Sequence, residues 1–355
     1  MHKVLVYPAD YDHCRSAIDR AFEVFPLDVA RKTVLVNPNA LRPGAAEEGV
    51  VTHPAVVRAL VEKLESLGAG QIVVGDNPGL PGYGANEDTF RSSGLMAAAK
   101  DYYRNIGSDA VPVDFNPEFI DRISVSRAVM EAEVMISVPK FKTHGLTIIS
   151  GALKNSYGII PGALKARMHA LAGNARRFSE MLIDVFQIRI PDLFIVDAVV
   201  GMEGNGPVST DLRDIGQILV SDNAVALDAV IARMMGLEPG MVSTIDFARQ
   251  RGLGDYHEAA IEIIGRFAPV PDFKLPPTID LAPDRPIGQG TGIAGKLKVK
   301  PAADRDLCTG CETCIDQCPV SALAMVDDLP QVDAEKCIAC FCCQEVCPEK
   351  AIRLS

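Results

Sequence analysis

Nine of the ten cysteines lie between residues 308 and 347, where one spacing occurs twice. Each copy reads Cys-x-x-Cys-x-x-Cys-x-x-x-Cys-Pro, the first from Cys308 to Pro319 and the second from Cys337 to Pro348. This is the bacterial two-cluster ferredoxin run, in which the fourth cysteine of each copy ligates the other cluster. Three thiolates on one tight loop can reach one cubane, whereas the fourth is carried away from it. The sequence therefore predicts two 4Fe–4S clusters in a compact C-terminal module.

The exchange of fourth cysteines divides eight thiols into two predicted ligand sets. One cluster is assigned to Cys308, Cys311, Cys314 and Cys347, and the other to Cys337, Cys340, Cys343 and Cys318. Cys342 lies off the repeat and is interpreted as a packing thiol close to a cluster, and Cys14 as a small buried side chain. Zinc is the alternative metal, but two complete repeats with both prolines disfavour it. Cysteines gathered in one segment favour metal over a disulfide framework.

The distribution of charge indicates which classes of partner the chain can bind. The chain of 355 residues carries a net charge of −11, and residues 304–355 alone hold ten acidic and four basic side chains. Such an acidic segment argues against nucleic acid, whose affinity comes mainly from Lys and Arg. It would suit docking to a basic patch on a redox protein, although an ordinary solvated surface is the alternative.

The location of the protein is predicted from two features of the sequence. No apolar run approaches the ~18 residues that span a bilayer. The start of the chain also lacks the apolar core and cleavage site of a signal peptide. We therefore expect a cytoplasmic protein without a membrane partner, and exposed cubanes indicate an anaerobic setting.

The remainder of the chain alternates strand and helix patterns. Residues 1–267 are predicted to form an α/β domain, a mostly parallel multi-stranded sheet with helices on both faces. Residues 268–301 are a Pro- and Gly-rich linker packed on that domain, and residues 302–355 form the ferredoxin-like domain. The linker contains Gly290-x-Gly292-x-x-Gly295, which we reject as a dinucleotide site because no strand precedes it and no helix follows. Strands are expected at residues 3–7, 32–37, 71–75, 110–114, 134–138, 193–198 and 217–220, and helices near residues 54–67, 87–103, 125–132, 175–189, 222–235 and 244–251.

Five predicted strands are followed by loops rich in Gly, Pro, Asn and charge. These loops are NPNALRPG, DNPGLPGYGANED, PKFKTHG, VVGMEGNGP and SDN. Ligands of open α/β sheets bind beyond the carboxyl ends of parallel strands. If the sheet is parallel, all five loops gather at one edge and form a candidate site.

The segment PKFKTHG supplies the basic candidates. Side chains alternate in an extended backbone, so Lys140, Lys142 and His144 are expected to share one face, with Lys154 and Asn155 following shortly after. The lysines could bind a phosphate or carboxylate, and His144 could move a proton. The alternative is an exposed basic edge strand that protects the sheet.

Acidic and amide candidates follow two other strands. Asp76 and Asn77 begin the loop after QIVVG, and Glu203 and Asn205 lie between glycines that let a ligand approach the backbone. Each pair has a structural alternative, a capped turn or a tight glycine turn. Asp222 and Asn223 are better explained as a helix N-cap, and Asp228, one turn further on, has weak support. The candidate catalytic residues are His144, Lys142 and Asp76. The candidate binding residues are Lys140, Lys154, Asn155, Asn77, Glu203 and Asn205.

The strings GDNPG (75–79), PKFKTH (139–144), LKNSYGIIPG (153–162) and GMEGNGP (201–207) resemble the family called domain of unknown function 362. Members of that family commonly end in a two-cluster ferredoxin-like segment, as this chain does. The resemblance covers nearly the whole sequence and implies an iron–sulfur protein, but it names no substrate. The roles of the residues within these strings rest on the strand-end argument alone.

Three functions are compatible with these features. The first is a reductase that passes single electrons through two 4Fe–4S clusters to a small anionic substrate, or to a bound cofactor such as flavin. The second is an electron-transfer subunit whose α/β domain docks a redox partner protein. The third is a non-redox enzyme in which the clusters are structural. The cysteine repeat supports electron transfer, and the basic loops favour the first function.

Overall fold

A computed structural model describes residues 1–80, 84–279 and 300–354. Its largest element is a sheet of nine strands whose main path runs β11–β1–β10–β9–β6–β2–β3. The pairs β11–β1, β9–β6, β6–β2 and β2–β3 are parallel, whereas β10 runs antiparallel to both β1 and β9. The sheet is thus mostly parallel, as the sequence predicts. Its strands are β1 (His2–Pro8), β2 (Thr33–Pro38), β3 (Gln71–Val74), β6 (Val134–Val138), β7 (Lys140–His144), β8 (Ile148–Ile149), β9 (Leu193–Met202), β10 (Leu212–Ser221) and β11 (Ile261–Gly265).

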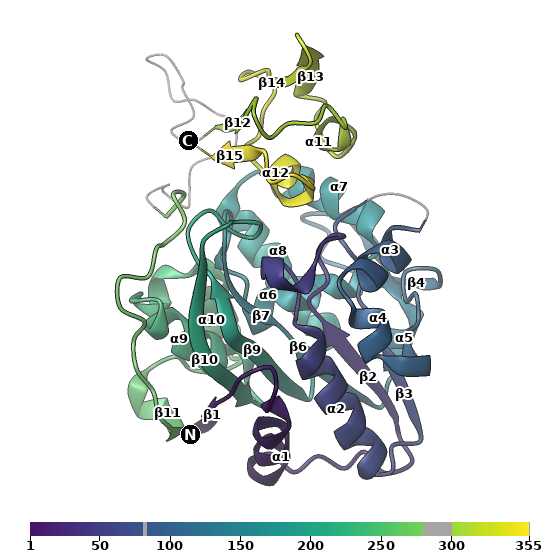
Figure 1. Cartoon of the computed structure of the whole chain (residues 1–355), viewed down its shortest axis with the longest axis vertical. Helices are drawn as coiled ribbons and strands as arrows, with labels where there is room; N and C mark the ends of the chain where they lie inside the picture. The colour runs from purple at the N-terminus through teal and green to yellow at the C-terminus, as the bar shows by residue number, and fades with distance from the viewer. Residues whose placement is uncertain (81–83, 280–299, 355) are drawn as a thin grey trace.

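Helices cover both faces of this sheet (Figure 1). Val34 and Val36 of β2 pack with α1 and α2 on one face, while Leu35 between them packs with α5, α7 and α8 on the other. This period-2 alternation gives each face its own core. The helices are α1 (Cys14–Val24), α2 (Pro54–Ser66), α3 (Ala85–Ser92), α4 (Leu95–Ala98), α5 (Arg127–Glu131), α6 (Ala152–Asn155), α7 (Gly162–Ala172), α8 (Ala175–Ile188), α9 (Ala224–Met234) and α10 (Ser243–Gln250).

Two expectations about strands need correction. Residues 110–114 form β4 (Ala110–Asp114), but among the described residues this strand pairs only with β5 (Arg122–Ser126), in a separate antiparallel hairpin. The loop SDN does not join the other four loops, because β10 runs antiparallel and Ser221 pairs with Phe194 near the start of β9. There Asn223 caps α9, its Oδ1 accepting a hydrogen bond from the Ala226 N–H at 3.0 Å.

Residues 268–279 pack on the main domain, and residues 300–354 form the C-terminal module. Phe273 contacts Phe141 edge-on, and the Val270 N–H donates to the Met234 carbonyl. Residues 280–299, which include the rejected Gly290–Gly295 motif, lie outside the described residues. Within the described residues no helix is long and apolar enough to cross a membrane. The module contains β12 (Pro301–Ala303), α11 (Thr313–Asp316), β13 (Leu323–Val326), β14 (Leu329–Val332), α12 (Cys342–Val346) and β15 (Ile352–Leu354), and it lies at one end of the sheet (Figure 1).

Candidate functional site

The cysteines of the module surround two separate cavities. Within the described residues, no three His, Cys, Asp or Glu side chains converge as the ligands of a single metal ion would. Eight thiols instead line two cavities in two groups of four. One cavity is lined by Cys308, Cys311, Cys314 and Cys347, and the other by Cys318, Cys337, Cys340 and Cys343. These groups coincide with the two ligand sets that the sequence repeat assigns.

Backbone N–H groups point at several of these sulfur atoms. The Ala322 N–H donates to Cys318 Sγ at 3.2 Å, and the Ala351 N–H donates to Cys347 Sγ at the same distance. Each acceptor is the fourth cysteine of its repeat. The same kind of hydrogen bond therefore occurs once in each half of the module. Such donors favour the thiolate form and tune the potential of a cluster. The residues present therefore fit a pair of 4Fe–4S clusters.

The two cysteine groups differ in their access to solvent. Cys311 in the first group is exposed, and we call this group the outer set. In the second group, Cys337, Cys340 and Cys343 are all buried, and we call it the inner set. The most exposed thiol of the two sets, Cys311, therefore belongs to the outer set, while Cys318 of the inner set is partly exposed.

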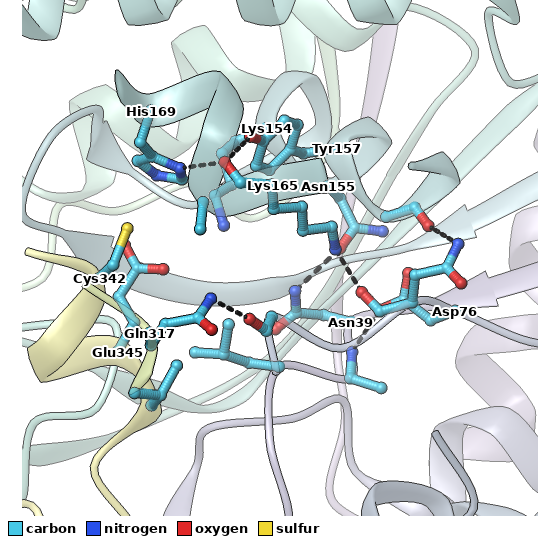
Figure 2. A pocket seen from close by; sticks show the side chains of 17 residues that line it. Asn39, Asp76, Lys154, Asn155, Tyr157, Lys165, His169, Gln317, Cys342 and Glu345 are labelled. Atoms are coloured by element: carbon cyan, nitrogen blue, oxygen red, sulfur yellow. Dashed lines mark hydrogen bonds between the residues drawn. The ribbon is translucent and has the colours of Figure 1, made fainter. Parts of the chain in front are cut away.

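A third cavity lies between the strand-end loops and the module (Figure 2). Its volume is ≈ 30 Å³, above the roughly 10–15 Å³ that one ordered water requires, and its mouth is open to solvent. In Figure 2, Cys342, Gln317 and Glu345 lie toward the yellow C-terminal ribbon and Asp76 lies on the opposite side. The lining residues are Asn39, Ala40, Leu41, Asp76, Asn77, Gly79, Lys154, Asn155, Tyr157, Gly158, Lys165, Ala166, His169, Gln317, Cys342, Glu345 and Val346.

Helix α6 brings Lys154 and Asn155 into this cavity. Its first turn is fixed by Asp228 of α9, whose carboxylate accepts from the Ala152 and Leu153 N–H groups at 2.6 and 3.0 Å. Burial nevertheless raises the pKa of Asp228 to about 7, against the effect of these two bonds. Asn155 accepts from Asn39 Nδ2 at 3.1 Å. Asp228 therefore acts at a distance from the cavity by holding the helix that lines it.

Asp76 is held rigidly at the carboxyl end of β3. Its Oδ1 accepts from Asn37 Nδ2 at 3.0 Å, and its Oδ2 accepts from the Ala40 N–H at 2.8 Å. Burial raises the pKa of Asp76, while the charge of Lys165 opposes that rise. A Cβ at Gly158 would lie 1.9 Å from Asp76 Oδ1, so only glycine allows this approach. The neighbouring Asn77 donates to the Gly158 carbonyl at 2.7 Å.

Helix α7 contributes Lys165 and His169. Lys165 Nζ donates to the Asn77 carbonyl, and burial lowers the pKa of Lys165 to about 8. His169 Nδ1 lies 2.8 Å from the Lys165 carbonyl, which can only accept, so we assign the ring proton to Nδ1. His169 Nε2 is then an acceptor, and it has no hydrogen-bond partner among the described residues.

Four residues of the module line the cavity, and two of them, Gln317 and Glu345, contact the main domain through polar atoms. Gln317, next to Cys318, donates from Nε2 to the Gly79 carbonyl at 2.7 Å. Glu345 Oε1 lies 3.1 Å from His144 Nε2, although the two atoms are not aligned as a hydrogen bond. Burial and the charge of Lys154 lower the pKa of His144 to about 4, so its ring is neutral at pH 7. Burial acts to raise the pKa of Glu345, but His144 and Lys154 outweigh it and hold the pKa at about 2.

The predicted site residues separate into two groups in the structure. Asp76, Asn77, Lys154 and Asn155 line the cavity, and His144 touches it through Glu345. The segment Lys140–His144 is buried and is not the exposed edge strand of the alternative interpretation. Lys142 Nζ donates to the Val50 carbonyl at 2.7 Å, away from the cavity. The remaining three residues are also bonded elsewhere: Lys140 Nζ to Asp197 at 2.8 Å, Glu203 to Arg213 at 3.2 Å, and the Asn205 carbonyl to Gln344 Nε2 at 2.6 Å.

Sequence reasoning missed six cavity residues that carry polar groups: Asn39, Tyr157, Lys165, His169, Gln317 and Glu345. Lys165 and His169 lie in α7, whose polar and apolar residues are mixed around the helix and give no amphipathic signal. The string LKNSYGIIPG, which ends where α7 begins, was the available clue. Gln317 and Glu345 lie within the cysteine repeats, where spacing draws attention to the thiols alone. Cys342, interpreted only as a packing thiol, also lines the cavity.

Comparison with known proteins supports both parts of the chain. Residues 34–233 match the model of the family described as domain of unknown function (DUF362), which is more than half of the chain. Residues 300–348 match a 4Fe–4S dicluster domain. The C-terminal segment is therefore an iron–sulfur domain.

Individual proteins similar to this chain share 30% or less of their aligned residues with it. A thylakoid-associated protein of Synechocystis sp. is 30% identical over 228 residues, which cover 62% of this chain and 68% of that protein. A solved structure from Thermotoga maritima is similar with a TM-score of 0.42 and 12% identity, covering 68% of this chain and 60% of that one. The lactate racemase apoprotein from Thermoanaerobacterium thermosaccharolyticum gives a TM-score of 0.43 and 11% identity, covering 63% and 55%. This chain thus spans less than two thirds of either solved chain. By the match over residues 34–233, the chain belongs to the DUF362 family.

Proposed function

We propose that the protein is an iron–sulfur reductase that delivers single electrons to a small anionic ligand in the cavity between the sheet and the module. One observation carries this proposal. Gln317 and Cys342 line the cavity, and both are close in sequence to inner-set cysteines, Cys318 and Cys343. When bound, 4Fe–4S clusters supply one-electron transfer over a wide range of potentials. The placement gives electrons a short route into a site that can hold a ligand.

The two cysteine sets support one direction of flow. Cys311 of the outer set is exposed, so a redox partner protein can approach that side of the module. Three cysteines of the inner set are buried, and Cys318 and Cys343 of this set directly follow Gln317 and Cys342, which line the cavity. We infer that electrons enter from a partner at the outer set and leave at the cavity. The acidic side chains of the module would orient a partner with a basic surface.

Two lysines of the cavity can compensate the negative charge that reduction adds to a ligand. Lys154 is 8% exposed, and no hydrogen bond or ion pair joins its ammonium to another described residue. It can therefore hold a carboxylate or phosphate group of the ligand. Lys165 has a pKa lowered to about 8 by burial, so it can release a proton near neutral pH. His144 is a weaker candidate for this role, because its lowered pKa leaves it without a second proton at pH 7.

The test measures two rates separately, the reduction of the clusters and their reoxidation by a small-molecule acceptor. Protein purified without oxygen is reduced photochemically and mixed with the low-molecular-weight fraction of its host cells, while the visible absorbance of the clusters is followed. We expect the native protein to be reoxidised. Lys154→Met should accept electrons equally and discharge them at least tenfold more slowly. Lys100→Met, which removes an exposed cation paired with Glu65, is the matched control.

Two outcomes would contradict the proposal. Equal reoxidation of the native protein and Lys154→Met would remove the cavity from the electron path. Absence of reoxidation together with a co-purifying protein chain would favour the electron-transfer subunit, whose α/β domain docks that chain. Neither result depends on knowing the ligand.

A further inference from the structure

Two buried side chains of opposite charge line the cavity without pairing with each other. Lys154 is 8% exposed and Glu345 is 7% exposed, and within the described residues no ion pair joins them. The Lys154 ammonium has no partner among those residues, and Glu345 has only the misaligned contact with His144. A buried charge is costly unless it is paired and hydrogen-bonded. The cavity therefore presents a cation and a carboxylate that a ligand can satisfy together.

Two further atoms of the cavity wall can only accept hydrogen bonds. His169 Nε2 is unprotonated, because Nδ1 donates to the Lys165 carbonyl, and it has no partner in the described part of the chain. Asn39 Oδ1 is likewise buried and unpartnered there, while its Nδ2 donates to Asn155. With Glu345 Oε1, the wall thus holds three buried acceptors without a hydrogen-bond partner in the described part of the chain, and the Lys154 side chain lines the same cavity. A ligand that fits must bring several donors as well as an anionic group.

We propose that the ligand class of this cavity is a small zwitterion that carries both a carboxylate and a primary amine. Lys154 binds the carboxylate, and the acceptors of Glu345, His169 and Asn39 take the N–H groups of the ammonium. This inference deepens the proposed function and rests on it for the ligand's role as electron acceptor. A free phosphate satisfies Lys154 but places its negative charge against Glu345 and supplies too few donors. A hydroxy acid supplies one donor and leaves the Glu345 charge unbalanced.

Binding is measured by calorimetry at pH 7 on oxidised, iron-loaded protein, so that no electron transfer is involved. The probes are the ω-amino acids from glycine to 5-aminopentanoate, each compared with the carboxylic acid and the amine of the same length. We expect at least one amino acid to bind tenfold or more tightly than either matched compound, which corresponds to about 1.4 kcal/mol. Because the probes differ in the number of methylene groups, the series samples a range of distances between the carboxylate and the ammonium of the ligand.

Variants assign each end of the probe to a side chain. In Lys154→Met the preferred amino acid should bind no better than the matched amine, and in Glu345→Gln no better than the matched acid. Lys100→Met should bind like the native protein. Because Glu345 lies close to cluster cysteines, iron content is measured in parallel. His169→Phe, which keeps the stacking on Phe178, is the second test of the amine end.

Three results would overturn the inference. These are binding of no amino acid, binding of a plain carboxylate as tightly as its amino acid, or an amine preference that survives in both Glu345→Gln and His169→Phe. Any of them leaves the reductase proposal standing, because that proposal is tested by reoxidation of the reduced protein. Conversely, if an amino acid binds but the reduced protein is not reoxidised, the binding site stands and the reductase proposal is wrong.

Discussion

Replacing Gly158 by alanine should damage the cavity through one identified clash. The added Cβ would lie 1.9 Å from Asp76 Oδ1 and 3.0 Å from Asp76 Cγ. Asp76 must then move and loosen its bonds to Asn37 and Ala40, at 3.0 and 2.8 Å. Overpacking costs roughly 1–3 kcal/mol, and a lost hydrogen bond to a charged group costs roughly 1.5–3 kcal/mol. We expect a loss of unfolding free energy on the order of 4 kcal/mol, the sum of these two effects.

A double-mutant cycle in urea, followed by far-ultraviolet circular dichroism, tests this assignment. In Asp76→Ala the clashing atoms are gone, and the next neighbour of the added Cβ is Asn37 Nδ2 at an ordinary 3.5 Å. Both effects act through Asp76, so the cost of Gly158→Ala should fall by on the order of 4 kcal/mol in that background. Gly173→Ala, where no atom lies within 4 Å of the added Cβ, should show only backbone strain that is independent of Asp76. Equal costs in both backgrounds, within about 0.5 kcal/mol, would refute the reasoning.

Three other predictions concern the module and the cavity. Cys342→Ala should keep the full iron content, whereas Cys347→Ala should lose iron, as colorimetric iron analysis of anaerobic protein will show. Gln317→Ala removes the bond to the Gly79 carbonyl, at a cost of about 1 kcal/mol, and should slow reoxidation of the reduced protein without changing its iron content. Burial lowers the pKa of Lys165 to about 8, so the ammonium loses its proton above that pH and anion affinity should decline there. In Lys165→Met that step in a calorimetric pH series should be absent, and a step that persists would assign it to another group.

Much of the fold follows from local patterns in the sequence. Buried apolar runs such as residues 71–74 and 134–138 predict central strands, and the spacing of Val56, Val57, Leu60 and Leu64 predicts α2. Strand direction is different, because the pattern of a strand is the same in both directions. The antiparallel course of β10, which removes the SDN loop from the site, could not be deduced from its residues.

The candidate site was predictable only where a local signal marks it. Asp76, Asn77, Lys154 and Asn155 follow strands or stand in distinctive strings, and they do line the cavity. Gln317 reaches Gly79 across 238 residues of sequence, and only the docking of the module brings the two together. Lys142 has the residue type of an anion-binding group, yet its ammonium is used within the protein by the Val50 carbonyl. Residue type alone does not distinguish these two uses.

Anomalous diffraction at the iron edge, on anaerobic crystals, tests the central claim most directly. The account predicts two cubanes, one among Cys308, Cys311, Cys314 and Cys347, and a second among Cys318, Cys337, Cys340 and Cys343 beside the wall that Gln317 and Cys342 form. A single iron site, or a second cluster remote from that wall, would contradict it.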